Sequence, residues 1–454
     1  MRLLHGVSEV SSYERWELAR VLGSAMVRGT YRPGPVRRIR IRKGHGTRPL
    51  EIASASDRVV QRAILQAIQP LLDPTFDERS FGFRPGLGRE HALIEAELLT
   101  TPGCVWVVDD LRDAFGQVPH ARLIDVLRFH GMDDRLVELI RRIITRGGRR
   151  RGIAQGGPLS PLLLNLFCDH FLDRLWRRRS RSPLIRYADD LLVISPNPTQ
   201  VQTDYALLRQ ITQAAGLPLK GTYETSHVRP DRGGRARWLG YDIHLDTQGH
   251  LAAHLGTDSW NGLQRALEKV REQVPTPLRL HHAAQVVRGW VDQHGPCCDS
   301  DREVHSRIAS LHWGAATEQL LSWAQFHEAW EGAHARFHQL RSVRLLMEAQ
   351  RQRGGSACAH FDSAENGRGG GASTEDAPLP SLPHITIYAT GACNCNPGVG
   401  GWAFYATGPG RRERIWRAGS HPRLTANRAA LMAVVRGLFS PTKSGRVLVE
   451  RVTR

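Results

Sequence analysis

Residues Tyr187-Ala188-Asp189-Asp190 place two adjacent carboxylates between the apolar runs 184–185 and 191–194. Apolar runs on both sides of a polar turn predict a β-hairpin with Asp189 and Asp190 at its tip. Like charges held this close repel each other, so the pair needs a counter-charge. With a third carboxylate, such a pair can hold two Mg²⁺ ions about 3.5–4 Å apart for phosphoryl transfer. A solvated β-turn, in which Asp is common, is the alternative.

A third carboxylate is available at the end of another apolar segment. Residues 105–108 predict a short strand that runs into Asp109-Asp110, and a rigid strand end can aim a metal ligand. We expect Asp110 to serve this role, while Asp109 fits a structural or solvated role better. Phe115 follows closely enough to wall a sugar pocket. Gln155-Gly156-Gly157 then leads into a helix, and its glycines permit close approach of backbone to a substrate.

The charge of the chain predicts a polyanionic partner. Among 454 residues, Lys and Arg number 62 against 44 Asp and Glu, which gives a net charge of +18. An excess of this sign favours nucleic acid. The seven cysteines form no paired CxxC spacing, no signal-peptide pattern opens the chain, and no apolar run approaches membrane-spanning length. We therefore expect an intracellular protein without a membrane partner.

Six stretches, taken together and in order, resemble a bacterial reverse transcriptase of the group II intron type. They lie within residues 13–245 and comprise 48–50 with 57–61, 80–86, 110–115, 155–161, 187–190 and 238–241. The resemblance implies an α+β right-hand polymerase with fingers, palm and a helical thumb. It also implies that Asp110, Asp189 and Asp190 are catalytic and bind two Mg²⁺ ions, with Mn²⁺ as an alternative.

The same resemblance assigns the remaining site residues. Nucleotide binding falls to Lys43, Arg48, Phe115 and Gln155, with Phe115 as a steric gate against a ribose 2′-hydroxyl. Primer or template binding falls to Tyr187, Trp238, Gly240 and Arg84, although a structural ion pair is the favoured alternative for Arg84. The sequence departs from the family pattern at the lysine expected after residues 216–219. Tyr223 or Glu224 occupies that position, and Lys220 lies nearby.

The resemblance, together with the composition of residues 352–382, divides the chain into four expected parts. Residues 1–245 would form fingers and palm, 246–351 a helical thumb or maturase-like region, and 352–382 a flexible linker rich in Gly and Ser. Residues 383–454 resemble a truncated ribonuclease H segment. Its expected acidic positions hold Thr390, Ala430 and a residue near Val452, so we expect no hydrolysis there.

These observations predict an RNA-directed DNA polymerase in the bacterial cytoplasm. Its partners would be an RNA template, a DNA or RNA primer and deoxynucleoside triphosphates, together with a cognate structured RNA if residues 283–290 act as a maturase thumb. Three alternatives stay open. The first is an RNA-binding maturase in which polymerase activity is dispensable, and the second is a domesticated reverse transcriptase that serves phage defence or repair. The third is a degenerate product with neither activity, against which the intact set of Asp110, Asp189 and Asp190 argues.

Overall fold

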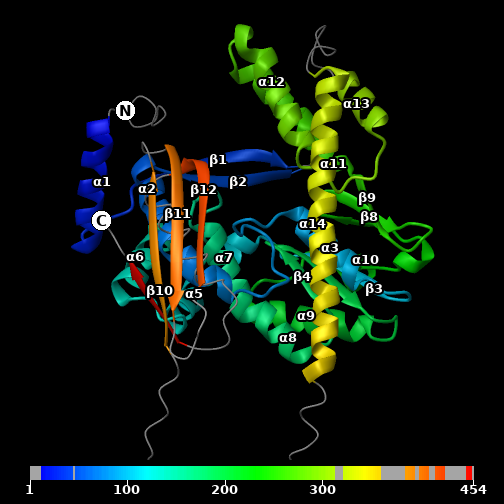
Figure 1. The fold of residues 1–454 in the computed structure, drawn as a ribbon, viewed down its shortest axis with the longest axis horizontal. Coiled ribbons are helices and arrows are strands. Elements are labelled where there is room, and N and C mark those ends of the chain that lie inside the picture. The colour runs from blue at the N-terminus through cyan, green and yellow to red at the C-terminus, as the bar shows by residue number, and fades with distance from the viewer. Residues whose placement is uncertain are drawn as a thin grey trace, which may run out of the picture. The chain divides into compact units, whose positions relative to one another are not determined.

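The computed structural model describes residues 12–43, 46–311, 321–358, 384–393, 398–407, 415–424 and 446–451. The chain divides into two compact units, residues 1–362 and 363–454. Figure 1 shows helices and strands intermixed in the first unit, which is an α+β fold. Within the described residues, no helix is both long and apolar enough to cross a membrane.

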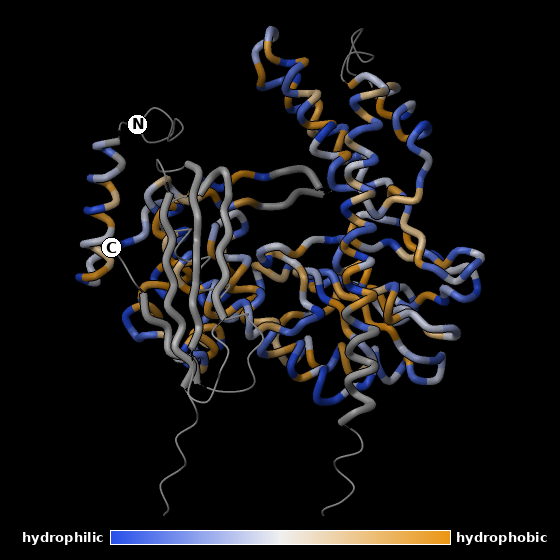
Figure 2. The backbone as a smooth tube through the Cα atoms, viewed as in Figure 1, coloured by the Kyte–Doolittle hydropathy of each residue, from blue (hydrophilic) through white to orange (hydrophobic). Residues whose placement is uncertain are grey.

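A four-stranded antiparallel sheet lies at the centre of the first unit, in the order β4-β5-β3-β6. Its strands are β3 (Val105–Asp110), β4 (Leu184–Tyr187), β5 (Asp190–Ser195) and β6 (His227–Val228). Nearly every position of β3 and β5 is buried, since helices cover the sheet. Hydrophobic segments accordingly concentrate around these strands (Figure 2). The strand predicted from residues 105–108 and the predicted hairpin are both present.

Helices pack against one face of this sheet to form a large apolar core, while the other face belongs to a second apolar core. The helices of the first core include α2 (Ala55–Leu72), α4 (Ala114–Gln117), α5 (His120–Phe129), α6 (Asp134–Ile144), α7 (Ser160–Cys168), α8 (Arg174–Arg179), α9 (Val201–Ala215) and α10 (Tyr223–Ser226). The long helix that residues 161–176 predict is present, with a π-helical segment at Asp169–Asp173 between α7 and α8. The sequence also predicts a cap at Ser56 or Asp57, whereas Ser54 caps α2 by accepting a hydrogen bond from the Asp57 amide at 3.1 Å.

A long two-stranded hairpin precedes α2. Strand β1 (Val36–Lys43) pairs with β2 (Gly46–Ala53) along its whole length, as the alternating basic pattern predicts. The preceding helix α1 (Ser12–Val27) exposes several apolar side chains, including Trp16. Buried Asp57 anchors the start of α2 by accepting hydrogen bonds from the Tyr31 hydroxyl and from the Gly34 amide.

A second sheet, of three strands, continues the fold. It contains β7 (Ala236–Trp238), β8 (Tyr241–Leu245) and β9 (Leu251–Leu255). The sequence suggests a single strand over 238–243, and this prediction is wrong. Leu239 and Gly240 have φ angles of 53° and 85°, so they form a two-residue turn that requires two left-handed residues.

Helices dominate the region after β9. They are α11 (Thr257–Gln273), α12 (Thr276–Val291), α13 (Asp301–Ser310) and α14 (Trp323–Cys358). In Figure 1, α14 is one long helix that runs alongside α3 (Arg89–Leu99). Two ion pairs join these helices, Arg341–Glu97 and Arg344–Glu95, each with a closest N···O distance of 2.5 Å. Helix α14 ends at Cys358, inside the segment 352–382 expected to be a linker.

The second unit contains a four-stranded sheet in the order β12-β11-β10-β13. Its strands are β10 (His384–Cys393), β11 (Gly398–Thr407), β12 (Ile415–Leu424) and β13 (Arg446–Arg451). Strands β10 and β13 run parallel, and the other pairs are antiparallel. Thr390 lies on β10 opposite Ala403. The predicted helix with Ala430, and Val452, lie outside the described residues.

Candidate active site

The backbone brings the three predicted catalytic acids to one end of the central sheet. Asp110 is directly opposite Asp190 in the β3–β5 ladder. The next residue, Leu111, donates its amide to the Asp189 carbonyl at 2.9 Å. Opposed residues in an antiparallel pair have Cα atoms about 5 Å apart. The convergence predicted from the sequence is therefore present in the backbone.

A tight turn presents the hairpin tip. Tyr187 pairs with Asp190, which leaves Ala188 and Asp189 as the turn, and Ala188 has a left-handed φ of 60°. The backbone of Gly82 presses against this turn, because a Cβ added to Gly82 would lie 2.3 Å from the Ala188 amide nitrogen. No side chain fits there, so the glycine at 82 is needed for the close approach.

A buried ion pair supports the tip from beneath. Arg186 donates three hydrogen bonds to Asp173, the shortest from Nη2 at 2.6 Å, and both side chains are almost fully buried. Its other terminal nitrogen donates to Asn165 Oδ1 at 2.9 Å and to the Ala188 carbonyl at 3.1 Å. The network thus fixes the turn that carries Asp189. These residues were not predicted from the sequence, although a charged Arg186 within an apolar strand was a signal.

The Lys220 ammonium is bound to Asp110. Its Nζ lies 3.1 Å from Asp110 Oδ2, and its backbone amide donates to the Asp110 carbonyl at 2.8 Å. The hydrogen bond to Asp110 raises the pKa of Lys220, and the charges of Asp190 and Asp109 add to this rise. The lysine is therefore held in the combined field of several carboxylates. Its side chain is 67% exposed, so the pair faces solvent.

Asp109 has a different environment from its neighbour Asp110. Its carboxylate is buried and accepts hydrogen bonds from the Gly221 amide at 2.8 Å and from Ser226 Oγ at 2.8 Å. These contacts anchor the loop that carries Lys220. Asp109 therefore has the structural role that the sequence favoured.

The three acids have the chemistry of a divalent-metal site, although their side chains are not yet grouped around one point. Among the described residues, no three His, Cys, Asp or Glu side chains are grouped, as they stand, to hold a metal ion. The donor set itself fits, because Mg²⁺ prefers carboxylate oxygens and Asp110 already binds a cationic group. Rotation of side chains at opposed strand positions changes their separation without moving the backbone.

The predicted nucleotide-binding residues lie on three separate elements. Phe115 on α4 is 6% exposed and meets the Phe83 ring edge-on, with centroids 6.2 Å apart. The Gln155 carbonyl accepts a hydrogen bond from the Glu51 amide at 2.9 Å, which ties its loop to β2. Arg48 and Lys43 lie on the β1–β2 hairpin, and their side chains are outside the described part.

The predicted primer-side residues lie around the β7–β8 turn. Trp238 is buried with 2% exposure, and Gly240 belongs to the turn itself. Arg89 donates to the Leu239 carbonyl at 3.0 Å and its guanidinium lies over the Tyr241 ring. These contacts join the turn to the start of α3.

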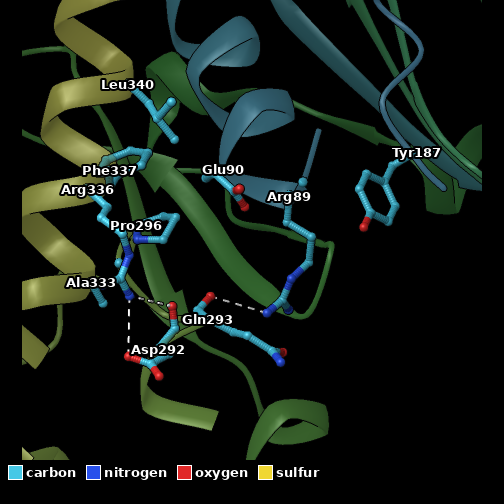
Figure 3. A pocket seen from close by; sticks show the side chains of 12 residues that line it. Arg89, Glu90, Tyr187, Asp292, Gln293, Pro296, Ala333, Arg336, Phe337 and Leu340 are labelled. Carbon is cyan, nitrogen blue, oxygen red and sulfur yellow. Dashed lines mark hydrogen bonds and ion pairs between the residues drawn. The ribbon is translucent and has the colours of Figure 1, made fainter. Parts of the chain in front are cut away.

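Tyr187 borders a cavity of about 310 Å³ beside this turn (Figure 3). Arg89 and Gln293 also line it, and Arg89 donates to the Gln293 carbonyl at 3.3 Å. Arg336 of α14 closes the opposite side, where it pairs with Asp292 at 3.3 Å. The cavity therefore lies where the hairpin tip, α3 and α14 meet.

Arg84 is held within the protein. Its guanidinium donates to the Asp73 carboxylate at 3.0 Å and to the Asp77 and Ser80 carbonyls at 2.9 and 2.7 Å. The side chain is only 10% exposed. These contacts agree with the structural alternative from the sequence analysis, and template binding by Arg84 stays an untested prediction.

Comparison with known proteins identifies the region that contains this site. Residues 41–222 match the reverse transcriptase (RNA-dependent DNA polymerase) family. Protein YkfC of Escherichia coli K12 is 36% identical over 172 residues, which are 35% of this chain and 45% of YkfC. The group II intron-encoded protein LtrA of Lactococcus lactis is 33% identical over 159 residues, which are 32% of this chain and 26% of LtrA.

A separate match covers a shorter segment. Ribonuclease H of Rhodopirellula baltica is 48% identical over 65 residues, which are 14% of this chain and 41% of that enzyme. Among solved structures, apo telomerase from Candida tropicalis aligns with a TM-score of 0.40 at 10% identity, covering 74% of this chain and 70% of that one. The chain spans less than half the length of each of the three curated relatives named. The resemblances predicted from the sequence are confirmed.

Proposed function

We propose that this chain, which carries a reverse transcriptase domain over residues 41–222, is an RNA-directed DNA polymerase. The observation that carries the proposal is the register of β3 and β5, which opposes Asp110 to Asp190 and bonds Leu111 to Asp189. Acids on rigid, hydrogen-bonded strand ends stay in position while a substrate changes its charge. A surface turn would not require this interlocking.

Asp110, Asp189 and Asp190 would hold two Mg²⁺ ions, or Mn²⁺ in their place. When bound, such ions lower the pKa of a primer 3′-hydroxyl and neutralise charge that develops on the phosphoryl group. The hydrogen bond from Arg186 to the Ala188 carbonyl holds in place the turn that contains Asp189. Lys220 neutralises Asp110 in the structure, and its exposed side chain is free to withdraw when another cation binds.

The proposed substrates are deoxynucleoside triphosphates on an RNA template with a DNA or RNA primer. Lys43, Arg48, Phe115 and Gln155 would contact the nucleotide, since the Gln155 loop is bonded to the hairpin strand that contains Arg48. Tyr187, Trp238 and Gly240 would support the primer end from the neighbouring turn. The net charge of +18 supports a nucleic-acid partner.

The domain boundaries follow from the same proposal. Residues 1–245 would be fingers and palm, 246–351 the thumb, 352–382 a connection, and 383–454 an inactive ribonuclease H-like segment. Thr390 on β10 replaces an expected acid, which removes a ligand that metal-assisted hydrolysis needs. Bacterial relatives support a bacterial cytoplasmic location.

Similarity to LtrA, an intron-encoded protein, supports a second candidate function, RNA binding as a maturase. Residues 283–290 lie on α12, where Ala283 and Val287 are buried and Trp290 packs on Trp260. These buried positions stabilise the helical region, which leaves its exposed face for RNA. In this case splicing of a bound intron would survive loss of the catalytic acids.

Primer extension on RNA and DNA templates tests the proposal. The wild-type protein should extend a primer with deoxynucleotides in Mg²⁺, and Asp189→Asn should abolish extension without unfolding. Asp125→Asn is the matched control, since Asp125 lies on α5 with its side chain 73% exposed. If the wild type shows no extension in Mg²⁺ or Mn²⁺, or if Asp189→Asn extends normally, the proposal is wrong.

A further inference from the structure

Glu95 is a charged residue at a buried position of α3. Its side chain is 3% exposed, and the residues on both sides of it, Ile94 and Ala96, are buried and apolar. A carboxylate in such a place is costly unless cationic partners bind it. None of the proposed catalytic or nucleotide contacts involves Glu95, so its burial has another reason.

The two carboxylate oxygens of Glu95 bind arginines from two different parts of the chain. Oε1 accepts a hydrogen bond from Arg79 Nε at 3.2 Å, and Oε2 accepts bonds from Arg344 Nε at 3.0 Å and Nη2 at 2.5 Å. Arg79 precedes α3, whereas Arg344 lies on α14, 249 positions after Glu95. Glu95 therefore joins α14 to the segment that contains Arg79.

That segment is hydrogen-bonded to β4, at the edge of the central sheet. The Arg79 carbonyl accepts a hydrogen bond from the Arg186 amide at 2.9 Å, and the Phe81 amide donates to the Arg186 carbonyl at 2.8 Å. Ser80, between them, pairs with Arg186 as a parallel bridge. Residues 79–81 thus extend the sheet beyond β4.

The extended edge supports the turn that contains Asp189. The Arg186 side chain donates to the Ala188 carbonyl, and Gly82 presses on the same turn from the segment that follows residues 79–81. A continuous set of bonds therefore leads from α14, through Glu95, to the catalytic hairpin. Groups linked in this way move together when one end is released.

A second ion pair between the same two helices has no such continuation. Glu97 binds Arg341 with a closest N···O distance of 2.5 Å, and among the described residues Arg341 is its only ion-pair partner. The two pairs share their chemistry and both attach α14 to α3. Only the pair at Glu95 also includes Arg79, through which it reaches the sheet.

We propose that Glu95 is a positioning residue that couples the docking of α14 to the alignment of Asp189. The effect on catalysis rests on the proposed polymerase function. A displacement of about 1 Å at a reacting group can slow a reaction on the order of 100-fold. Docked α14 holds the sheet edge beneath the turn, and its release from Glu95 leaves that edge less constrained.

The variants Arg344→Gln and Arg341→Gln test the inference as a matched pair. Each removes one ion pair between α14 and α3 by the same substitution, and Glu95 keeps a cation in both because Arg79 remains. In Arg344→Gln, kcat for deoxynucleotide incorporation should fall about tenfold at an unchanged KM, since alignment is lost while the nucleotide contacts are kept. Arg341→Gln should keep kcat within about twofold of the wild type.

Two further variants separate alignment from a general loss of stability. Arg344→Lys keeps the charge and should recover most of the lost kcat. Glu95→Gln should be slow, and adding Arg344→Gln to it should slow incorporation no further, because both changes interrupt the same set of bonds.

Amide hydrogen exchange measures the coupling without catalysis. Peptides that cover 79–82 and 184–190 should exchange faster in Arg344→Gln than in Arg341→Gln, while peptides from α9 should exchange equally in both. Equal kcat, or equal exchange of 184–190, in the two variants would overturn the inference. If the wild type incorporates no nucleotide, the proposed function is refuted, and the exchange comparison still decides whether Glu95 couples α14 to the hairpin.

Discussion

Asp109 and Asp110 are adjacent on β3, yet their surroundings differ completely. Asp109 is buried and bound by a backbone amide and a serine hydroxyl, which are parts of the fold. Asp110 has a 38% exposed side chain and binds Lys220, whose own side chain is 67% exposed. A buried acid with fixed neutral donors stabilises the protein, whereas an exposed acid with a replaceable cationic partner can exchange it for a ligand.

Other buried acids of the central sheet region follow the Asp109 pattern. Asp204 accepts hydrogen bonds from Ser182 Oγ at 2.6 Å and from Ser195 Oγ at 2.7 Å. Asp173 is buried too but differs in its partner, which is the cationic guanidinium of Arg186, itself almost fully buried. The presence of an aspartate therefore does not distinguish a structural position from a catalytic one. The distinguishing feature is whether its bound partner can be exchanged for a ligand.

The largest expected effect is on catalysis. Asp110→Asn removes a charge at the strand end, so the rate of primer extension should fall by at least roughly 10³-fold. Loss of the exposed Lys220 pair should change the free energy of unfolding by less than about 1 kcal/mol. Steady-state extension and urea denaturation measure the two quantities. Substantial primer extension by Asp110→Asn would contradict the catalytic role that distinguishes Asp110 from Asp109.

Asp173→Ala should have the next largest effect, this time on stability. The change leaves the Arg186 guanidinium buried without its counter-charge and should lower the free energy of unfolding by about 3 kcal/mol. Urea denaturation measures the loss. The double variant Asp173→Leu with Arg186→Met is the control and should recover part of it, because no charge then stays buried. Equal destabilisation in both variants would contradict this account of the ion pair.

Asp109→Asn should destabilise the protein by about 2 kcal/mol, because the amide disrupts the buried hydrogen bonds to Gly221 and Ser226. Any loss of extension should be far smaller than in Asp110→Asn. The paired variants differ by one position and share the same chemical change. If Asp109→Asn and Asp110→Asn lost similar amounts of stability and of primer extension, the contrast between these neighbours would not be functional.

His294 extends the comparison to a buried base. Burial lowers the pKa of His294 to about 4, and Ser259 and the Trp290 carbonyl bind its ring nitrogens. The unfolded chain binds the proton near pH 6.5, so stability should fall by about 1 kcal/mol between pH 7 and pH 5.5. His294→Asn should reduce this slope, whereas His281→Gln, at an exposed position of α12, should not. Urea denaturation across this pH range measures the slope. An unchanged slope in His294→Asn would contradict the prediction.

Local sequence patterns were sufficient for the strand ends and the hairpin. Apolar runs on both sides of Asp189 and Asp190 specify buried strands, and the acids mark where β3 ends and β5 begins. Convergence of the acids therefore followed from patterns that each span a few residues.

Contacts between segments that are distant in the sequence could not be predicted from such local patterns. Lys220 reaches Asp110 across 110 positions of sequence, and Asn165 reaches Gly82 across 83. The strained Phe83 and the turn at Leu239 also depend on packing, because neither residue type favours a positive φ. Tertiary contacts enforce these conformations, which local propensity alone does not contain.

Calorimetric titration of Mn²⁺ into the protein with primer, template and a non-hydrolysable nucleotide tests the central claim most directly. The wild type and Asp109→Asn should both bind the metal, and Asp110→Asn should lose most of this binding while it stays folded. Equal Mn²⁺ binding by the wild type and Asp110→Asn would contradict the proposal that these strand ends form the metal site.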